Sequence, residues 1–330
     1  TTSGLRLGYD ALILATGARR HPWLDGAITF RGAPDVEAIR ALLADLEASG
    51  IDRLVFAAPP AESWTLPRYE LALLTAGSVA ERGLAGVRLT IVTPEPFPLA
   101  LFGPRAGAAV RQLLGDRGIR LLSASYPVEL AGNALALRPA ASVPADRVIT
   151  LAHCEGLGIA GLPHDAHGFI PTDRHARVDG VDHVYAAGDG TTFPIKQGGI
   201  AAQQADAAAE AVAATLGAPI EPQPFKPVLR GMLLTGLGPT YLRADISGAA
   251  GDSFEFDTKP LWWPPAKIAG EHLGPYLARR APWSNPVNLA DLQSKRPDVQ
   301  THHDHSAARE RAFAAAPADP EPRERLTAIR

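Results

Sequence analysis

The 330-residue sequence has little cysteine, no long apolar run and almost no net charge. Its single cysteine, Cys154, excludes an internal disulfide framework and a Cys-x-x-Cys redox pair. No apolar run reaches the roughly 18–20 residues of a membrane-spanning helix, and no signal peptide is visible. The formal net charge is −3, so without a basic excess a nucleic-acid partner is not expected.

What the sequence does contain is an alternation of strand-like and helix-like segments. Apolar residues recur at helical spacing over 35–48, and short apolar segments at 51–58 and 87–93 are typical of buried strands. The same reasoning predicts helices over 67–82, 104–117 and 199–216, and strands over 5–15, 118–123, 146–152 and 182–187. This alternation predicts an α/β fold with a parallel, doubly wound sheet. Antiparallel strands over 228–258 and a helix over 266–279 are expected to follow.

The most specific stretch is 184–199, VYAAGDGTTFPIKQGG. A short apolar strand delivers Asp189 to the carboxyl end of a sheet, the edge at which open α/β sheets bind ligands. A carboxylate there can accept hydrogen bonds from a sugar-alcohol hydroxyl. Gly198 and Gly199 then begin a helix, whose free N–H groups and partial positive charge stabilise a ring that becomes anionic on reduction. Glycine also lets such a ring approach the backbone.

Three blocks in this order resemble the two-dinucleotide-domain flavoproteins. Residues 9–17, YDALILATG, look like the YDxLxxATG strand and turn of that superfamily. Residues 161–173 resemble the approach to its last flavin strand, and 184–189 resemble that strand with its ribityl-binding Asp. The superfamily includes pyridine nucleotide-disulfide reductases, type II NADH dehydrogenases and sulfide:quinone oxidoreductases. The similarity covers roughly residues 5–215.

The resemblance implies a Rossmann-like FAD/NAD(P)-binding fold and an FAD-dependent oxidoreductase. Hydride or electrons would pass through the flavin to an unknown acceptor, with a quinone as one candidate. Asp189 would bind the ribityl chain, and the backbone from Gly198 to Ile200 would face the pyrimidine edge of the flavin. Lys196 is either a cation that favours the reduced flavin or a surface lysine. The expected cofactor-binding residues are Thr16, Gly17, Gly188, Asp189, Lys196, Gly198, Gly199 and Ile200.

No catalytic residue and no metal ligand is predicted. Cys154 is interpreted as a small buried residue rather than as a redox centre. The histidine-rich stretch 302–305 could bind a metal loosely, but it falls in a segment without a structural pattern, and it is discounted as a site.

The sequence departs from the superfamily at its N-terminus. The flavin domain there begins with a strand–GxGxxG–helix unit that holds the FAD pyrophosphate, and none precedes Tyr9. The only G-x-G-x-x-G is 156–161, and with Pro163 following it no helix can begin. The chain is therefore expected to be N-terminally incomplete, either as a fragment or as part of a split protein, and to hold FAD weakly alone.

The expected NAD(P) site departs as well. The strand at 51–58 leads into Pro59 and Pro60 where the superfamily has a second glycine-rich loop, so NAD(P) binding is doubtful. Glu95 follows the next strand. It could hold a ribose, although a solvated loop carboxylate is the simpler interpretation.

These interpretations divide the chain into five parts. Residues 1–20 would end the first FAD-domain segment, 21–145 would be an NAD(P)-binding-like and degenerate domain, and 146–218 would be the second FAD-domain segment. Residues 219–285 would form a small C-terminal α+β interface domain, and 286–330 a mobile tail.

Partners and location stay open. The aromatic residues Trp262, Trp263, Tyr276 and Trp283 could form a rim for a quinone or a membrane surface, and a homodimer interface explains them equally well. The expected location is cytoplasmic, with peripheral membrane contact as the alternative. A second functional class is a non-catalytic remnant, a scaffold or binding subunit without its own FAD site. A flavin spectrum of the purified chain separates the two classes.

Overall fold

The computed structural model describes residues 6–48, 50–59, 63–139, 141–247, 250–263, 265–273 and 276. The described residues belong to one compact unit, Thr1–Trp283. The predicted tail over 286–330, the stretch 302–305 and Trp283 lie outside the described residues.

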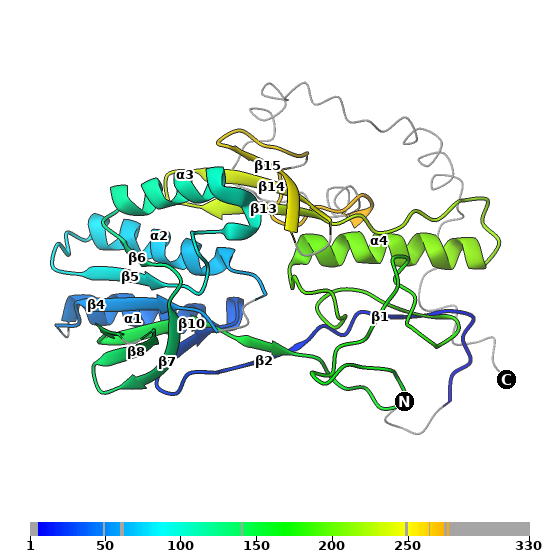
Figure 1. Ribbon diagram of the computed structural model, residues 1–330, viewed down its shortest axis with the longest axis horizontal. Coiled ribbons are helices and arrows are strands. Elements are labelled where there is room, and N and C mark those ends of the chain that lie inside the picture. Colours follow the sequence, from blue (N-terminus) through cyan, green and yellow to red (C-terminus); the bar gives the residue numbers. More distant parts are fainter. Residues whose placement is uncertain are drawn as a thin grey trace, which may run out of the picture. The chain divides into compact units, whose positions relative to one another are not determined.

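Five parallel strands form the central sheet (Figure 1). In spatial order they are β3 (Ile28–Phe30), β10 (Arg147–Leu151), β4 (Arg53–Ala57), β5 (Arg88–Val92) and β6 (Arg120–Leu122). The inner strands read RVITL, RLVFA and RLTIV, the continuous apolar runs expected of a sheet covered on both faces. β10 belongs to this sheet, although its residues lie within 146–218, the range expected to be the second FAD-domain segment.

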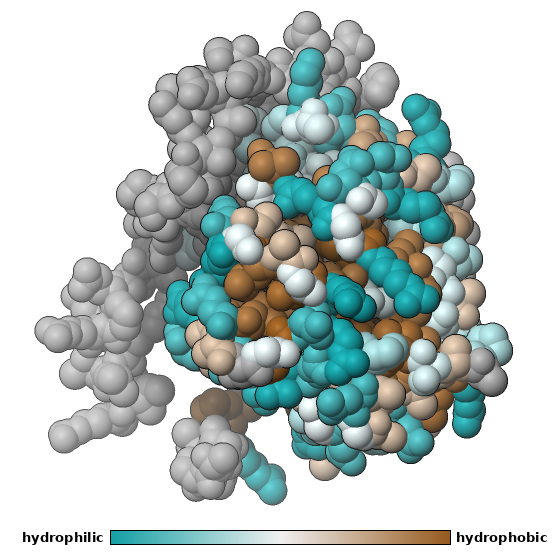
Figure 2. Space-filling view, turned by 90° about the vertical axis from the view of Figure 1, so that its left-hand side faces the viewer, coloured by the Kyte–Doolittle hydropathy of each residue, from teal (hydrophilic) through white to brown (hydrophobic). Residues whose placement is uncertain are grey.

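The two faces of the central sheet are covered differently. Leu54 and Phe56 of β4 pack with three helices, α1 (Val36–Ala48), α2 (Leu66–Glu81) and α3 (Gly103–Asp116). Val55 and Ala57 pack instead on an antiparallel meander of β7 (Tyr126–Ala131), β8 (Ala134–Arg138) and β9 (Ala141–Pro144). Figure 2 views this part of the molecule from its end and shows an apolar middle ringed by hydrophilic side chains.

The α/β class and the Rossmann-like fold are confirmed, but helices on both faces of this sheet were the wrong expectation. The chain between β6 and β10 alternates apolar and polar residues with a period of two, as in β8, where Leu135 and Leu137 are buried. That period suits a half-buried strand rather than a helix.

A second region is built on two strands far apart in the chain. β1 (Leu12–Leu14) pairs in parallel with β12 (Val184–Ala186), so that Ile13 lies opposite Tyr185. The helix α4 (Gly198–Thr215) packs small residues, Ala208 and Ala211, against Tyr185. An antiparallel pair, β2 (Arg19–His21) and β11 (His153–Glu155), lies between this region and the central sheet (Figure 1).

The predicted antiparallel strands are confirmed as a third region: β13 (Val228–Leu234), β14 (Pro239–Ser247) and β15 (Ala250–Asp257). This sheet shares one apolar core with α2 and the short 3-10 helix η2 (Ala100–Phe102); a second such helix, η1 (Ala33–Asp35), precedes α1. The fit is close, because a Cβ at Gly231 would lie 2.8 Å from both Leu66 Cδ1 and Phe102 Cζ. Over the helix predicted at 266–279, the described residues 265–272 are irregular, whereas Leu273 and Tyr276 are helical. None of the helices in the described ranges is long and apolar enough to cross a membrane.

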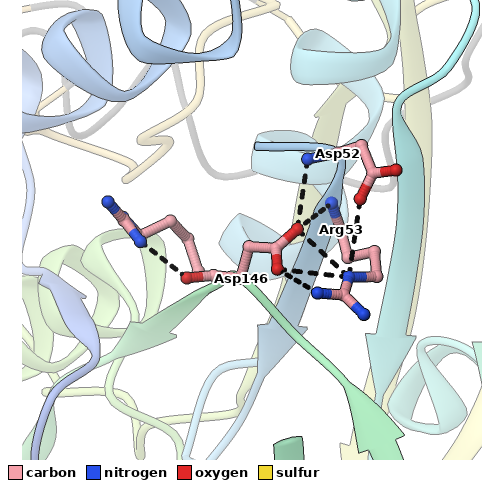
Figure 3. A network of polar contacts seen from close by, with 4 residues as sticks. Asp52, Arg53 and Asp146 are labelled. Atoms are coloured by element: carbon pink, nitrogen blue, oxygen red, sulfur yellow. Dashed lines mark hydrogen bonds and ion pairs between the residues drawn. The ribbon is translucent and has the colours of Figure 1, made fainter. Parts of the chain in front are cut away.

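An ion pair links the amino ends of β4 and β10 (Figure 3). The Asp146 carboxylate accepts hydrogen bonds from the backbone N–H groups of Asp52 (3.1 Å) and Arg53 (3.0 Å) and from the Arg53 guanidinium. Bonding to Arg53 holds the pKa of Asp146 well below its usual range. These groups lie at the opposite end of the strands from the carboxyl edge, so their role is structural.

Candidate functional site

The turns that follow β1 and β12 meet at one edge of the strand pair. Thr16 and Gly17 follow β1, and Gly188 and Asp189 follow β12, so parallel pairing brings both turns out at the same edge. The φ angles of Gly17 (+70°) and Gly188 (+85°) favour glycine. A Cβ at Gly190 would lie 2.9 Å from the Gly17 carbonyl oxygen, so a glycine at 190 lets the two turns touch.

The Asp189 carboxylate accepts few hydrogen bonds from the described part of the protein. Its side chain is 19% exposed, and Arg20 Nη2 donates to its Oδ2 at 3.2 Å. No second side-chain hydrogen bond to this carboxylate occurs within the described residues. A carboxylate has room for about four hydrogen bonds, so Asp189 retains acceptor capacity for a ligand. Arg20 was not predicted from the sequence, although the arginine pair at 19–20, close after the ATG turn, was a visible signal.

A buried glutamine on α4 holds the turn that carries Asp189. Gln204 Oε1 accepts the N–H of Gly188 at 2.7 Å, and its Nε2 donates to Thr191 Oγ1 at 3.2 Å. The Thr191 hydroxyl in turn donates to the Gly188 carbonyl at 3.0 Å. Gln204 is 5% exposed. The sequence analysis missed it as well, although a Gln pair in an alanine-rich helix was a signal.

Lys196 folds back onto the same turn. Its Nζ donates to the carbonyl oxygens of Thr191 (2.5 Å) and Phe193 (2.7 Å) and lies 3.9 Å from the centre of the Phe169 ring. Burial lowers the pKa of Lys196 to about 8, while the negative charge of Asp189 acts in the opposite direction. Lys196 is thus a half-buried cation beside Asp189 rather than a freely solvated one. Its role toward a flavin stays a prediction.

The start of α4 is partly capped from within. Gln197 Oε1 accepts the N–H of Ile200 at 2.8 Å, and the Ile200 side chain is buried in the core. The N–H groups of Gly198 and Gly199 make no hydrogen bond to any described residue. At Gly198 a Cβ would lie 3.1 Å from Ile268 Cδ1, so the isoleucine lies over the helix start. Two of the three predicted backbone donors are therefore without a hydrogen-bond partner among the described residues, although Gly199 itself is buried.

The G-x-G-x-x-G at 156–161 is a loop, as predicted. The N–H groups of Gly156 and Gly158 donate to the carbonyl oxygens of His167 (2.9 Å) and Gly168 (3.1 Å), and no helix begins there. Cys154 lies opposite Arg20 in the β2–β11 pair, and burial raises the pKa of its thiol. Cys154 is half-buried rather than buried as expected, and a raised pKa does not favour a reactive thiolate. That Cys154 has no redox role stays a prediction.

The aromatic rim is smaller than expected. Trp262 is 9% exposed, packs edge-on against Tyr241 with ring centres 5.2 Å apart, and donates its Nε1–H to the Ala266 carbonyl. It is therefore a core residue. Trp263 and Tyr276 are 39% and 41% exposed and stay candidates for a contact surface.

Comparison with known proteins agrees with this fold. Residues 71–211 match the sequence profile of the family described as pyridine nucleotide-disulphide oxidoreductase, and no curated protein matches the sequence. Among solved structures, the sulfide:quinone oxidoreductase of Aquifex aeolicus superposes with a TM-score of 0.66 at 17% identity, over 77% of this chain and 66% of that one. A ferredoxin reductase of Rhodopseudomonas palustris superposes with a TM-score of 0.55 at 19% identity, over 76% and 61% of the two chains.

A third similar structure is a NAD-dependent persulfide reductase of A. fulgidus, with a TM-score of 0.52 at 18% identity, over 73% of this chain and 45% of that one. The chain thus spans about two thirds or less of the length of these structures. The resemblance predicted from the sequence is confirmed: the chain has the FAD/NAD(P)-binding fold of the pyridine nucleotide-disulphide oxidoreductases.

Proposed function

We propose that this protein is an FAD-dependent oxidoreductase that passes hydride or electrons through its flavin. The observation that carries the proposal is the parallel pairing of β1 with β12. It places Gly17 and the Gly188-Asp189 turn at one edge, with a carboxylate that Arg20 only partly occupies. The match of residues 71–211 to the oxidoreductase family and the shared fold support it.

The described residues fit the flavin end of FAD. Asp189 would accept hydrogen bonds from the ribityl hydroxyls, since its carboxylate retains acceptor capacity. Gly17 and Gly188 would let the cofactor approach the backbone at the two turns. The free N–H groups of Gly198 and Gly199, at the positive end of α4, would face the pyrimidine edge of the ring. The bound flavin supplies the redox chemistry, and the protein supplies binding and electrostatics.

Lys196 adds a fixed positive charge to this site. Two backbone carbonyls and the Phe169 ring orient its ammonium group, so little reorganisation is needed when negative charge develops nearby. Around neutral pH, below its pKa of about 8, the amine carries its proton. We therefore assign Lys196 an electrostatic role rather than a proton-transfer role.

For the acceptor we propose an apolar molecule of the quinone type. Ile268, 46% exposed, lies over the first residue of α4, and the exposed Trp263 belongs to the same segment. Apolar side chains beside the flavin edge suit an apolar acceptor. Reoxidation of the photoreduced, FAD-loaded protein by a soluble quinone analogue, compared with its reoxidation by ferricyanide, tests this choice. Equal rates for Ile268→Lys and wild type with the quinone would count against it.

FAD titration into the purified protein, followed by flavin fluorescence, tests the main proposal. Asp189→Ala should raise the dissociation constant about 10- to 100-fold, because a hydrogen bond to a charged group contributes roughly 1.5–3 kcal/mol. Asp182→Ala, at the exposed turn before β12, is the matched control and should bind FAD as the wild type does. Unchanged affinity in Asp189→Ala would remove the site assignment. Weak FAD binding is already expected without a glycine-rich pyrophosphate loop, so riboflavin, which has no phosphate, is titrated as well. A wild-type protein that binds neither FAD nor riboflavin would favour the scaffold alternative.

A further inference from the structure

We infer that the NAD(P)-like part of the chain does not bind NAD(P)H, because an internal carboxylate, Glu95, occupies the place that the dinucleotide would take. In such folds the pyrophosphate lies at the start of the helix after the first strand, and an acidic residue after the next strand holds the ribose. The corresponding elements are β4, the start of α2 and Glu95 after β5. These residues do not fit a dinucleotide.

The hydrogen-bonding capacity of Glu95 is already used. Its side chain is 12% exposed, and the carboxylate accepts bonds from two neighbouring elements. The donors are Thr65 Oγ1 (3.2 Å), Arg68 Nη2 (3.1 Å), Tyr69 Oη (2.6 Å), Thr93 Oγ1 (3.1 Å) and the Ala100 N–H (3.1 Å). These five donors meet or exceed the roughly four lone-pair positions of a carboxylate. A ribose hydroxyl could be bound only by displacing one of them.

The start of α2 is closed to a pyrophosphate. Thr65, Leu66 and Arg68 are 7%, 2% and 1% exposed, and Leu66 packs against Gly231 of β13. Pro67 has no N–H group, and the N–H of Arg68 donates to the Thr65 carbonyl at 3.2 Å. No glycine occurs between residues 51 and 76, so no backbone there is free of side chains for close approach.

Charge opposes a second anion at the same place. Arg68 and Glu95 form an ion pair beside the first turn of α2, so no uncompensated positive side chain is left there to offset the charge of a pyrophosphate. The Arg68 guanidinium is engaged with Glu95, with Thr93 Oγ1 at 3.0 Å and with the Tyr69 ring at 5.0 Å. Because Arg68 is buried in these contacts, its cation is not offered to a ligand.

One consequence concerns the electron donor and rests on the proposed function. If the flavin is bound at Asp189, it is reduced by a donor that reaches it directly and not by a nicotinamide held on β4, α2 and β5. The closure of the dinucleotide site itself does not depend on flavin binding, so the two proposals fail separately.

Calorimetric titration with NADH and with NADPH tests the inference, with FAD and riboflavin titrated into the same preparation. We expect no saturable binding of either nucleotide up to about 1 mM, a range that covers the usual affinities of substrates. A micromolar dissociation constant, with amide-exchange protection over residues 65–69 and 93–100, would overturn the inference. Nucleotide binding without protection there would support closure of this site. Absence of binding for both FAD and riboflavin would overturn the proposed function and leave the inference standing.

A pair of variants tests the network. Glu95→Gln places an NH2 group among donors, and its melting temperature should fall by about 5 °C or more, with nucleotide binding still absent. Glu81→Gln, at the exposed end of α2, is the matched control and should leave the melting temperature unchanged. If Glu95→Gln does not fold, Tyr69→Phe removes a single donor and should lower the melting temperature by a smaller amount. A wild-type melting temperature in both variants would overturn the argument.

Discussion

Glu95 and Asp189 occupy similar places in two regions of the molecule, yet their carboxylates differ in how many hydrogen bonds they accept from the protein. Each follows a short buried strand, β5 or β12, near its carboxyl end. Among the described residues, five donors surround Glu95, whereas Asp189 has one ion-pair partner, the half-exposed Arg20. The comparison shows that an acidic residue at a strand end is a structural ligand or a binding residue according to how many donors the protein itself supplies.

The regions around the two carboxylates differ in the same sense. Glu95 lies in the turn after β5 of a five-stranded sheet covered on both faces, and its partner Arg68 is 1% exposed. Asp189 follows a strand pair in which, among the described strands, β1 has only β12 as a neighbour, and Ile13 of β1 is 43% exposed. A carboxylate in the first setting contributes to folding, and one in the second is accessible to a ligand.

Removing Glu95 should have the largest effect on stability. Glu95→Ala leaves the buried Arg68 guanidinium without its carboxylate, and breaking such a buried pair costs about 3–5 kcal/mol. Urea unfolding of the variant and of Glu81→Ala measures the difference. A loss below about 1 kcal/mol would mean that Glu95 resembles Asp189 after all.

Adding a methyl group between the two turns should have the second-largest effect on stability. Gly190→Ala places a Cβ about 2.9 Å from the Gly17 oxygen and should cost about 1–3 kcal/mol through overpacking. Because the turns would move apart, FAD should also bind at least about tenfold more weakly, as a loss of roughly 1.4 kcal/mol implies. Gly180→Ala is a poor control because its φ is +71°, whereas Gly86→Ala has open space and no positive φ. Wild-type FAD affinity in Gly190→Ala would show that the two turns do not form the FAD site.

Removing the partner of Asp189 should change stability little. The Arg20–Asp189 pair is half exposed on the arginine side, and such pairs contribute about 0–1 kcal/mol. Arg20→Ala should therefore unfold near the wild-type urea midpoint, in contrast to Glu95→Ala. A midpoint as low as that of Glu95→Ala would show that Asp189 is structural too.

The titration of Lys196 should have the smallest effect on the free energy of unfolding. Its folded pKa, about 8, lies below the usual value of 10.5, so the unfolded chain binds more protons between these pH values. The free energy of unfolding of the wild type, relative to Lys196→Met, should therefore rise as pH increases from 8 to about 10.5 and stay flat below 8. Urea unfolding across this range measures the difference. A relative stability that falls with pH would mean that the carbonyl and ring contacts outweigh burial.

Local sequence was sufficient for several of the helices and buried strands and for the order of the turns. Apolar runs bounded by proline or glycine located β4 and β5, and helical spacing located α1, because these signals depend on neighbouring residues alone. The string GDGTTFPIKQGG placed Asp189 after a strand and Gly198 at a helix start for the same reason. The β7–β9 meander was missed because its short strands carry a weak period-two pattern.

Only the tertiary structure decided which of the two carboxylates has its hydrogen-bonding capacity used by protein donors. The first-turn donors to Glu95 lie some thirty residues before it, and Arg20 lies 169 residues before Asp189. No local pattern registers such pairings, because they arise when parallel strands bring distant turns to one edge. The sequence by itself therefore determined that both carboxylates would stand at strand ends. The number of donors around each carboxylate decides between a buried structural role and an open binding position. That number came from the packing of α2 on β5 and from the contact of Arg20 on β2 with the turn after β12.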